Sequence, residues 1–127
     1  MERSMPKKVL IADDEPNIVM SLQFLMEFEG YEVRTAADGD EALKALRDFH
    51  PDLVLLDVMM PKRNGYEICQ VIRASPELEG IKVVMLTAKG RDIDAEKGVA
   101  LGADSYVTKP FATKELVATV KAMLGDA

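Results

Sequence analysis

The sequence has little of what several common classes of protein require. Its 127 residues include one cysteine, Cys69, and one histidine, His50. A single cysteine excludes an internal disulfide, and a single histidine excludes a histidine-cluster metal site. Both counts favour a reducing cytoplasm, with Cys69 as a small apolar residue and His50 in an exposed loop. No apolar run approaches the ~20 residues that a membrane helix needs, and the first residues lack a signal peptide's apolar stretch. The sequence therefore predicts a cytoplasmic protein that does not bind a membrane.

Basic residues are in the minority. The chain has 16 Lys and Arg against 22 Asp and Glu, which gives a net charge of −6. Phosphate backbones and anionic lipid repel such a chain, so direct nucleic-acid binding is not expected. With 48% hydrophobic and 30% charged residues, the composition is that of an ordinary globular protein. A chain of this length can bury about two-thirds of its surface, which suits one domain.

Five short apolar runs alternate with five longer segments of helical period. The expected strands are Val9–Ala12, Tyr31–Thr35, Leu53–Leu56, Ile81–Leu86 and Ser105–Val107, and the expected helices are about Pro16–Glu29, Asp40–Phe49, Gly65–Ala74, Asp92–Leu101 and Thr113–Leu124. This alternation across short loops predicts a parallel α/β sheet in one unit, 1–127, with a core of about 7–124. The first, third and fourth strands have fully apolar stretches and are expected at the sheet centre, whereas the second alternates and suits an edge. Gly30 is expected in the left-handed conformation that ends the first helix.

Polar residues follow four of the five expected strands, where open parallel sheets bind ligands. They are Asp13 and Asp14 after the first strand, Asp57 after the third, Thr87 after the fourth, and Thr108, Lys109 and Pro110 after the fifth. Three carboxylates at one sheet edge repel one another, so a cation is expected among them. Either Lys109 alone or a bound divalent ion could provide the positive charge. Carboxylates without His or Cys select Mg²⁺, Ca²⁺ or Mn²⁺ over Zn²⁺, and Mg²⁺ is favoured because it keeps positions open for water and phosphate oxygens.

These residues belong to a longer pattern. Its fragments, in order, are Val9-Leu10-Ile11-Ala12-Asp13-Asp14-Glu15-Pro16, Leu53-Val54-Leu55-Leu56-Asp57-Val58-Met59-Met60-Pro61, Asn64-Gly65, Leu86-Thr87-Ala88, Gly102-Ala103-Asp104 and Lys109-Pro110-Phe111. In this order and at this spacing they make the chain resemble a response-regulator receiver domain of two-component signalling, of the chemotaxis-regulator type, over nearly its full length. The resemblance implies a flavodoxin-like α/β fold, with a five-stranded parallel sheet of order 2-1-3-4-5 and five helices on its two faces.

The resemblance also implies a role for each acid. Asp57 would be the phosphoacceptor, whose carboxylate attacks a phosphohistidine on a sensor histidine kinase or a histidine phosphotransfer protein. Asp14, Asp57 and the backbone carbonyl of Met59 would hold Mg²⁺, with Mn²⁺ as an alternative, and Asp13 would act mainly through metal-bound water. The chain would then catalyse its own aspartyl phosphorylation and dephosphorylation while acting mainly as a signalling switch.

The remaining family positions concern the response to phosphorylation. Lys109 and Thr87 would contact the phosphoryl group, and Tyr106 stands where similar receivers carry an aromatic that turns inward when the threonine moves. The Lys109-Pro110 pair matches the family's cis peptide. Phosphorylation would change the surface of the fourth helix, last strand and fifth helix, which a downstream protein target would recognise. The resemblance also implies a monomer or a weak phosphorylation-dependent dimer.

The first expected helix has more apolar residues than one core-facing stripe needs. If the core stripe is Ile18, Leu22, Leu25 and Met26, the residues that point away are Val19, Met20 and Phe24. Met20 and Phe24 are then expected to form an exposed pair. Two interpretations remain open: tolerated surface hydrophobes, or a docking face for the phosphodonor with Pro110 and Phe111 nearby.

Other functions would keep a similar fold. A receiver-like module that binds protein without phosphate is disfavoured because the chain has Asp13, Asp14, Asp57, Thr87 and Lys109. A haloacid-dehalogenase-like phosphatase needs an acid where this chain has Met59. A flavin binder needs Gly, Ser or Thr where the chain has acids and proline after its first strand. The sequence leaves open whether the chain is a complete regulator or a receiver taken from a longer protein.

Overall fold

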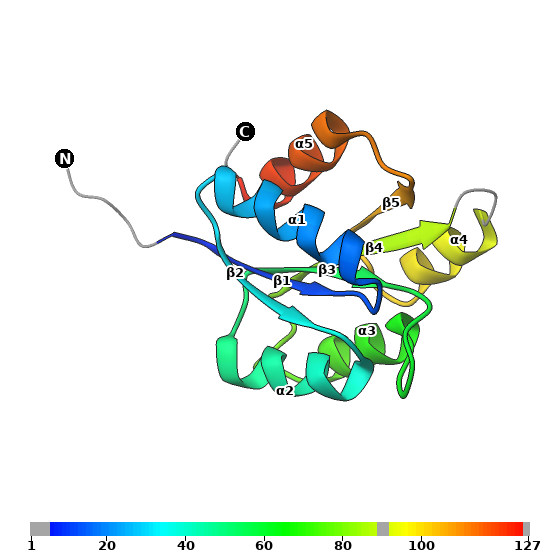
Figure 1. Ribbon diagram of the computed structural model, residues 1–127. Coiled ribbons are helices and arrows are strands. Elements are labelled where there is room, and N and C mark those ends of the chain that lie inside the picture. The colour runs from blue at the N-terminus through cyan, green and yellow to red at the C-terminus, as the bar shows by residue number, and fades with distance from the viewer. Residues whose placement is uncertain (1–5, 89–91, 126–127) are drawn as a thin grey trace.

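The computed structural model describes residues 6–88 and 92–125 of the chain. The strands are β1 (Lys8–Ala12), β2 (Glu32–Ala36), β3 (Leu53–Asp57), β4 (Lys82–Ala88) and β5 (Ser105–Lys109). The helices are α1 (Pro16–Phe28), α2 (Gly39–Phe49), α3 (Gly65–Ala74), α4 (Asp92–Ala100) and α5 (Thr113–Leu124). The strands are all parallel and lie in the order β2-β1-β3-β4-β5, which confirms the order that the resemblance implied (Figure 1).

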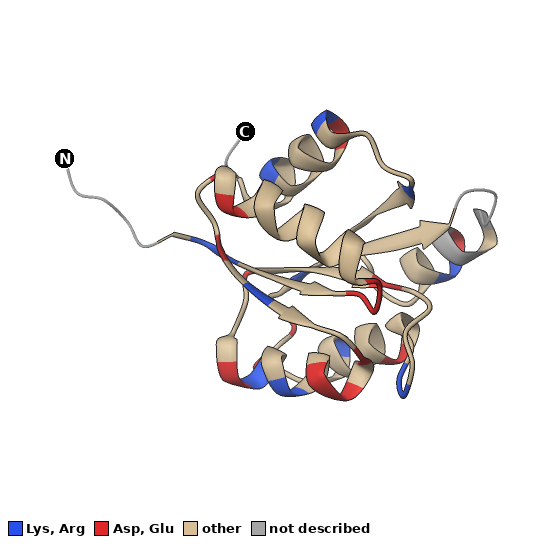
Figure 2. Ribbon diagram, in the orientation of Figure 1, with Lys and Arg blue, Asp and Glu red and all other residues tan. Residues whose placement is uncertain are grey.

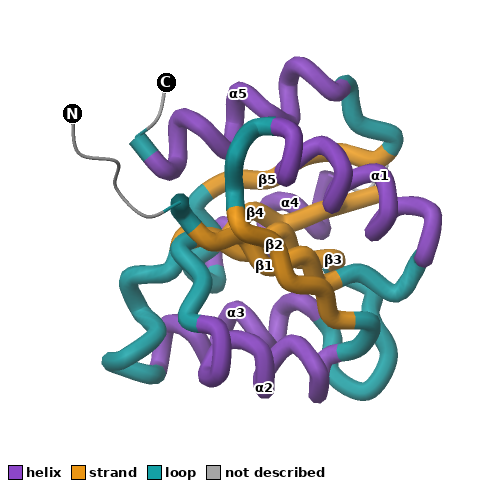
Figure 3. The backbone as a smooth tube through the Cα atoms, turned by 60° about the vertical axis from the view of Figure 1, so that its left-hand side comes forward, coloured by secondary structure: helices purple, strands orange, loops and turns teal. Residues whose placement is uncertain are grey.

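Helices cover both faces of the sheet. α1 and α5 lie on one face, and α2, α3 and α4 lie on the other (Figures 1 and 3). Because successive residues of a strand point to opposite faces, the inner strands feed two separate apolar cores. The core under α1 and α5 includes Ile11, Leu22, Leu55, Leu86 and Val120, and the core under the other three helices includes Leu10, Leu56, Ile68, Ile72 and Met85. This two-sided burial explains the fully apolar stretches of β1, β3 and β4, and confirms that they are the inner strands.

The helices begin and end where the sequence provides the right caps. Pro16 is the first residue of α1, and Gly30, just beyond its end, has a φ of +93°, as predicted. The Asp38 side chain accepts a hydrogen bond from the amide of Glu41, so α2 begins at Gly39, one residue earlier than expected. None of the described helices combines the length and apolarity that a membrane span requires.

Two sequence expectations on boundaries and burial are corrected. β4 and β5 continue through polar residues to Ala88 and Lys109, because the ladder pairs Thr87 with Thr108 and Ala88 with Lys109. Val19, which was expected to point away from the core, is partly buried. It lies beside β2, the edge strand that flanks α1, so this side of the helix is covered.

The two residues that were expected to play no part in chemistry lie as predicted. His50 is exposed and ends α2 in a left-handed conformation. Cys69 is fully buried in the core under α2, α3 and α4, where burial raises the pKa of its thiol.

The end of α3 is tied to two other segments through one side chain. The guanidinium of Arg73 donates to the carbonyls of Glu79 and Ile81, both in the segment just before β4, at 2.8 and 3.0 Å. It also donates to the carbonyl of Gly102 at 2.8 Å and to the carboxylate of Asp104 at 2.6 Å, both before β5. Arg73 therefore holds the loops before β4 and β5 against α3, at the end of the sheet away from the carboxyl ends of the strands.

Candidate functional site

Three carboxylates meet at the carboxyl edge of the sheet, as predicted. Asp13 and Asp14 follow β1, and Asp57 is the last residue of β3, the neighbour of β1 in the sheet. One carboxylate oxygen from each residue lies within 4.8 Å of the others. Asp13 and Asp57 are buried and Asp14 is exposed, so the cluster has a closed side and an open side.

Lys109 brings a positive charge into this cluster from the end of β5. Its Nζ lies 2.8 Å from Asp13 Oδ2, 3.1 Å from Glu15 Oε1 and 3.5 Å from Asp57 Oδ1. Asp13 Oδ2 is buried and makes no aligned hydrogen bond within the described chain, so the lysine charge is what holds it there. The peptide that follows Lys109 is cis, as the resemblance implied.

Asp57 is positioned by the loop that follows it and by the first turn of α3. Its Oδ1 accepts a hydrogen bond from the Met59 amide at 3.2 Å. The Gly65 amide donates to the Val58 carbonyl at 2.9 Å, and a Cβ added to Gly65 would lie 2.5 Å from the Asp57 carbonyl oxygen. Asn64 caps α3 at this point. Only glycine therefore lets α3 begin directly against the backbone of Asp57.

The charges of the cluster are not balanced. Burial, with the negative charge of Asp13, raises the pKa of Asp57 from 3.8 to about 6, although Lys109 and the Met59 amide oppose the shift. Burial alone would lower the pKa of Lys109, but its contact with Asp13 and the charge of Asp57 raise it above its ordinary value. One ammonium thus faces four carboxylates, including that of Glu15, and the site holds an excess of negative charge at neutral pH.

This arrangement fits a hard divalent cation. The donors are carboxylate oxygens, which such cations prefer, and Asp13 Oδ2 is a buried oxygen whose contact within the described chain is with the ammonium of Lys109. The excess negative charge would be reduced by a bound cation. The acidic triad Asp13, Asp14 and Asp57 could therefore hold a metal ion, as the sequence predicted.

Thr87 and Tyr106 lie on adjacent strands beside the cluster. The ladder pairs Leu86 of β4 with Asp57 of β3, so Thr87 is the next residue beyond the acid. Thr87 is buried, whereas Tyr106 is 49% exposed. Tyr106 pairs with Met85, two residues before Thr87, so the tyrosine and the threonine share the face of the sheet that α4 covers. The tyrosine is in an outward position.

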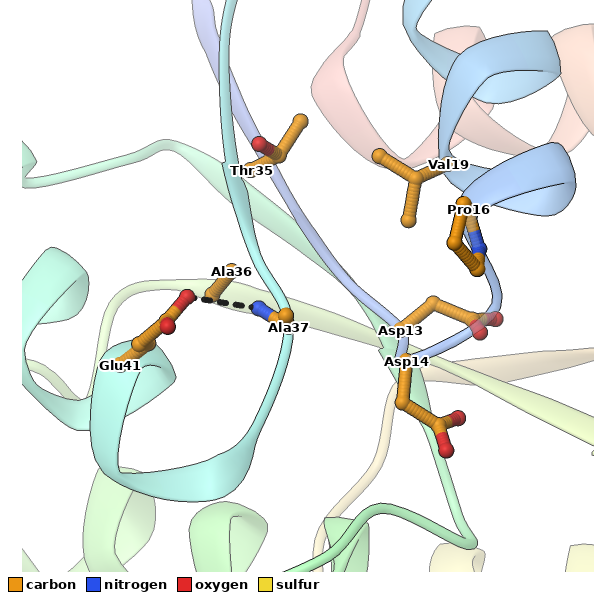
Figure 4. Close-up of a pocket in the computed structure, with 8 residues that line it drawn as sticks. All are labelled: Asp13, Asp14, Pro16, Val19, Thr35, Ala36, Ala37 and Glu41. Carbon is orange, nitrogen blue, oxygen red and sulfur yellow. Dashed lines mark hydrogen bonds between the residues drawn. The ribbon is translucent and has the colours of Figure 1, made fainter.

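A pocket of about 210 Å³ opens next to the acids, between α1 and the segment from β2 to α2 (Figure 4). Its lining residues are Asp13, Asp14, Pro16, Val19, Thr35, Ala36, Ala37 and Glu41. Glu41 Oε1 accepts a hydrogen bond from the Ala37 amide at 2.9 Å and so closes one wall. The sequence did not predict this pocket, because half of its lining residues come from the segment from β2 to α2, whose approach to α1 is set by the tertiary fold.

The candidate docking residues differ in exposure. Met20 is 68% exposed and Phe24 71% exposed, as predicted, and Pro110 is also exposed. Phe111 is only partly available, because it packs against the core under α1 and α5. Sequence reasoning assigned no role to Phe28, which is 77% exposed, although it repeats the four-residue spacing of Met20 and Phe24.

Glu15 was also missed as a site residue. Its position directly after Asp14 could have indicated that it belongs to the site. Its contact with Lys109 shows that the lysine pairs with a fourth carboxylate in addition to the triad. Every other residue that was assigned to the cluster by sequence lies at this edge of the sheet.

Comparison with known proteins agrees with this geometry. Residues 9–121 match the family model of the response regulator receiver domain. The chain belongs to this family. The alkaline phosphatase synthesis transcriptional regulatory protein PhoP of Bacillus subtilis is 48% identical to it over 120 residues, which cover 94% of this chain and 49% of that protein. This receiver thus spans about half the length of that relative.

Solved structures share the receiver's fold as well as its sequence. The chemotaxis response regulator CheY4 of Vibrio cholerae matches with a TM-score of 0.87 and 32% identity, over 94% of this chain and 99% of that chain. NtrX of Brucella abortus matches with a TM-score of 0.88 and 30% identity, over 95% of this chain but only 27% of that chain. The receiver fold is therefore found both as nearly a whole chain and as part of a longer one.

Proposed function

We propose that this receiver accepts a phosphoryl group on Asp57, in a Mg²⁺-dependent transfer from a phosphohistidine on a sensor histidine kinase or a histidine phosphotransfer protein. The convergence of Asp13, Asp14 and Lys109 on Asp57 carries the proposal. An Asp57 carboxylate oxygen forms a bond to phosphorus while the P–N bond breaks, and the leaving imidazole keeps the electron pair and takes a proton from solvent. Water hydrolyses the resulting mixed anhydride, so the switch is reversible.

The acidic residues would hold the metal ion. Asp14, Asp57 and the Met59 carbonyl are the proposed direct ligands of Mg²⁺, or of Mn²⁺, and Asp13 acts mainly through water. When bound, the ion neutralises charge on the phosphoryl oxygens. The excess negative charge of the cluster and the buried Asp13 Oδ2 support this assignment. The free thiol of Cys69 is consistent with the reducing cytoplasm, where we expect the receiver to act.

Lys109 and Thr87 would bind the phosphoryl group itself. Lys109 Nζ already lies 3.5 Å from Asp57 Oδ1, within reach of a group attached to that carboxylate. The Thr87 hydroxyl would donate a hydrogen bond to a phosphoryl oxygen, and Tyr106 would turn inward as Thr87 shifts. The outward position of Tyr106 leaves this movement available. The surface of α4, β5 and α5 would then change for a downstream protein target.

Mass spectrometry of the intact protein tests the phosphorylation. After incubation with a small-molecule phosphodonor and Mg²⁺, the chain should gain one phosphoryl group, and a chelator or Asp57→Asn should abolish the gain. Asp52→Asn is a matched control, because Asp52 precedes the opposite end of β3 and should leave labelling unchanged. Full labelling of Asp57→Asn would refute the assignment.

The protein phosphodonor would dock on α1 and on the loop after β5. Met20 and Phe24, with Pro110 and the accessible part of Phe111, could form the apolar centre of that contact. Phe24→Ala should therefore slow transfer from the cognate histidine protein but leave labelling by a small phosphodonor unchanged. Ile93→Ala, an equally exposed site on α4, is the control. Equal loss with both donors, or no loss with either, would contradict this docking face.

A further inference from the structure

Glu15 stands at the start of α1, but its side chain does not cap that helix. The Glu15 carbonyl accepts a hydrogen bond from the Val19 amide at 3.0 Å, as the carbonyl of a capping residue should. Asp, Asn, Ser and Thr are the usual residues here, because their short side chains accept hydrogen bonds from the first helical amides. The Glu15 side chain accepts none from the helix and instead contacts Lys109 Nζ at 3.1 Å. A residue that departs from the local rule in this way is often a functional one.

The ammonium of Lys109 already has several acceptors around it. It has three N–H donors, and its nitrogen lies 2.8 Å from Asp13 Oδ2, 3.1 Å from Glu15 Oε1 and 3.5 Å from Asp57 Oδ1. The two nearer oxygens come from the acidic loop between β1 and α1 (Figure 2). A phosphoryl group on Asp57 would bring three more acceptor oxygens and further negative charge to the same ammonium. It would therefore compete with the carboxylates that are already there.

Of these carboxylates, that of Glu15 is the most easily displaced. Asp13 is fully buried, and its Oδ1 accepts a hydrogen bond from the Glu15 amide at 2.9 Å, so the backbone fixes its position. Asp57 would carry the phosphoryl group itself. The Glu15 side chain is 60% exposed, so water can solvate its carboxylate when Lys109 leaves. Exposed ion pairs contribute little to stability, and this contact is readily exchanged for a stronger one.

We propose that Glu15 is a positioning residue that competes with the phosphoryl group for Lys109, an inference that rests on the proposed phosphorylation of Asp57. Before phosphorylation, Glu15 and Asp13 hold the ammonium on the side of the cluster that faces the β1–α1 loop. After phosphorylation, Lys109 exchanges Glu15 for a phosphoryl oxygen and keeps Asp13. Glu15 thus stabilises the unphosphorylated state and lowers the affinity of the site for a phosphoryl group.

Glu15 has the opposite effect on a divalent cation. Its carboxylate adds negative charge beside the acidic triad and partly neutralises Lys109, which repels a cation. Loss of the Glu15 charge should therefore weaken Mg²⁺ binding while it strengthens the binding of a phosphoryl group. A substitution that merely disturbed the structure of the site would weaken both. The two opposite signs distinguish the proposed role from a structural one.

Titration with beryllofluoride at saturating Mg²⁺, followed by fluorine NMR, measures the affinity for a phosphoryl mimic without any transfer reaction. Glu15→Gln should lower the dissociation constant of beryllofluoride about two- to fivefold, which is the range for removal of an exposed ion pair. Calorimetry without beryllofluoride should show that the same variant binds Mg²⁺ more weakly than the natural chain.

Glu41→Gln is the matched control. Glu41 lines the same pocket as Asp14, so its substitution removes the same charge near the acids, and glutamine can still accept the Ala37 amide. The ion pairs of Lys109 in the described chain do not include Glu41, so the dissociation constant of beryllofluoride should not change.

A double-variant cycle tests whether Glu15 acts through Lys109. The free energy of unfolding in urea, with a chelator present, is measured for Glu15→Gln, for Lys109→Met and for both together. Glu15→Gln should alter stability in the natural chain but not when Lys109 is already replaced. This measurement needs neither a metal ion nor a phosphodonor.

Glu15 is exposed, so circular dichroism should show that Glu15→Gln folds normally. Unchanged or weaker beryllofluoride binding in Glu15→Gln, an equal gain in Glu41→Gln, or no coupling between Glu15 and Lys109 would each overturn the proposal. If the natural chain is still labelled on Asp57, such a result leaves the proposed function intact. A natural chain that neither binds beryllofluoride nor becomes labelled would refute the proposed function, and the competition for Lys109 with it.

Discussion

The ionised carboxylate of Asp57 is unfavourable in the folded protein, so Asp57→Asn should stabilise the chain near neutral pH. Burial and the nearby charge of Asp13 raise the pKa of Asp57 from 3.8 to about 6. This increase in pKa means that the ionised carboxylate lowers the free energy of unfolding by about 3 kcal/mol relative to the protonated carboxyl. Asparagine has the same shape without the charge, and the raised pKa is already net of the attraction of Lys109. We therefore expect a net gain of about 1–3 kcal/mol in the absence of divalent ions.

The gain should depend on pH in a defined direction. The pKa of Asp57 is higher in the folded state than in the unfolded state, so between pH 3.8 and about 6 the folded protein binds more protons. This contribution to stability is complete below pH 3.8 and is lost as the pH rises through about 6. Asp57→Asn has no carboxyl at this position, so it does not lose this stability as the pH rises. Its advantage over the natural chain should grow from near zero at about pH 4 to its full value at about pH 7.

Urea unfolding with a chelator present, repeated across this pH range, measures the effect. The gain corresponds to a rise in melting temperature of about 4 °C per kcal/mol for a domain of this size. Mg²⁺ should then stabilise the natural chain more than the variant, because it binds the folded carboxylate cluster. Asp52→Asn, at the other end of β3, should show no such gain. A variant less stable than the natural chain at about pH 7, or a difference that does not change with pH, would refute the reasoning.

Three further predictions concern the lysine, the tyrosine and the glycine of the site. Lys109→Ala should bind Mg²⁺ at least as tightly as the natural chain, because it removes a competing positive charge, and a clearly weaker affinity by calorimetry would count against the role of Lys109 at the phosphoryl group. A stable phosphoryl mimic should change amide hydrogen exchange near Tyr106, and unchanged protection with the site occupied would exclude the coupling. Gly65→Ala should lower the free energy of unfolding by about 1–3 kcal/mol, because its Cβ would lie 2.5 Å from the Asp57 carbonyl oxygen. Gly80→Ala, with open space around the added Cβ, is the control and should change stability little.

The sequence predicts the inner strands well because their environment is uniform. β1 and β3 are buried on both faces, so an unbroken apolar run is enough to identify them. The ends of β4 and β5 are harder to predict from hydrophobicity, because the ladder continues there through Thr87 and Lys109. Both residues are polar and belong to the candidate site. Hydrophobicity cannot report a strand end whose side chains serve a function. The strand order came from the family resemblance, since periodicity alone does not fix which strands are neighbours.

The candidate site is predictable to the extent that it depends on strand ends. Asp13 and Asp57 meet because β1 and β3 are parallel neighbours that end at the same edge. Features that depend on the spacing between helices are not predictable in this way. The pocket beside the acids exists because the segment from β2 to α2 approaches α1, and Val19 is covered on the same side. Such distances are set by the packing of many side chains together.

The Arg73 side chain has a consequence for how the protein opens. Its guanidinium donates hydrogen bonds to Gly102 and to Asp104, and Asp104 is 31 residues beyond Arg73 in the chain. Asp104 also accepts a hydrogen bond from the Val83 amide at the start of β4. Fraying of the last turn of α3 would deprive all these acceptors of their donor at once. The region from α3 to β5 should therefore open as one cooperative unit, in which distant amides share a common free energy of exposure. The acids lie at the opposite edge of the sheet and take no part in these bonds.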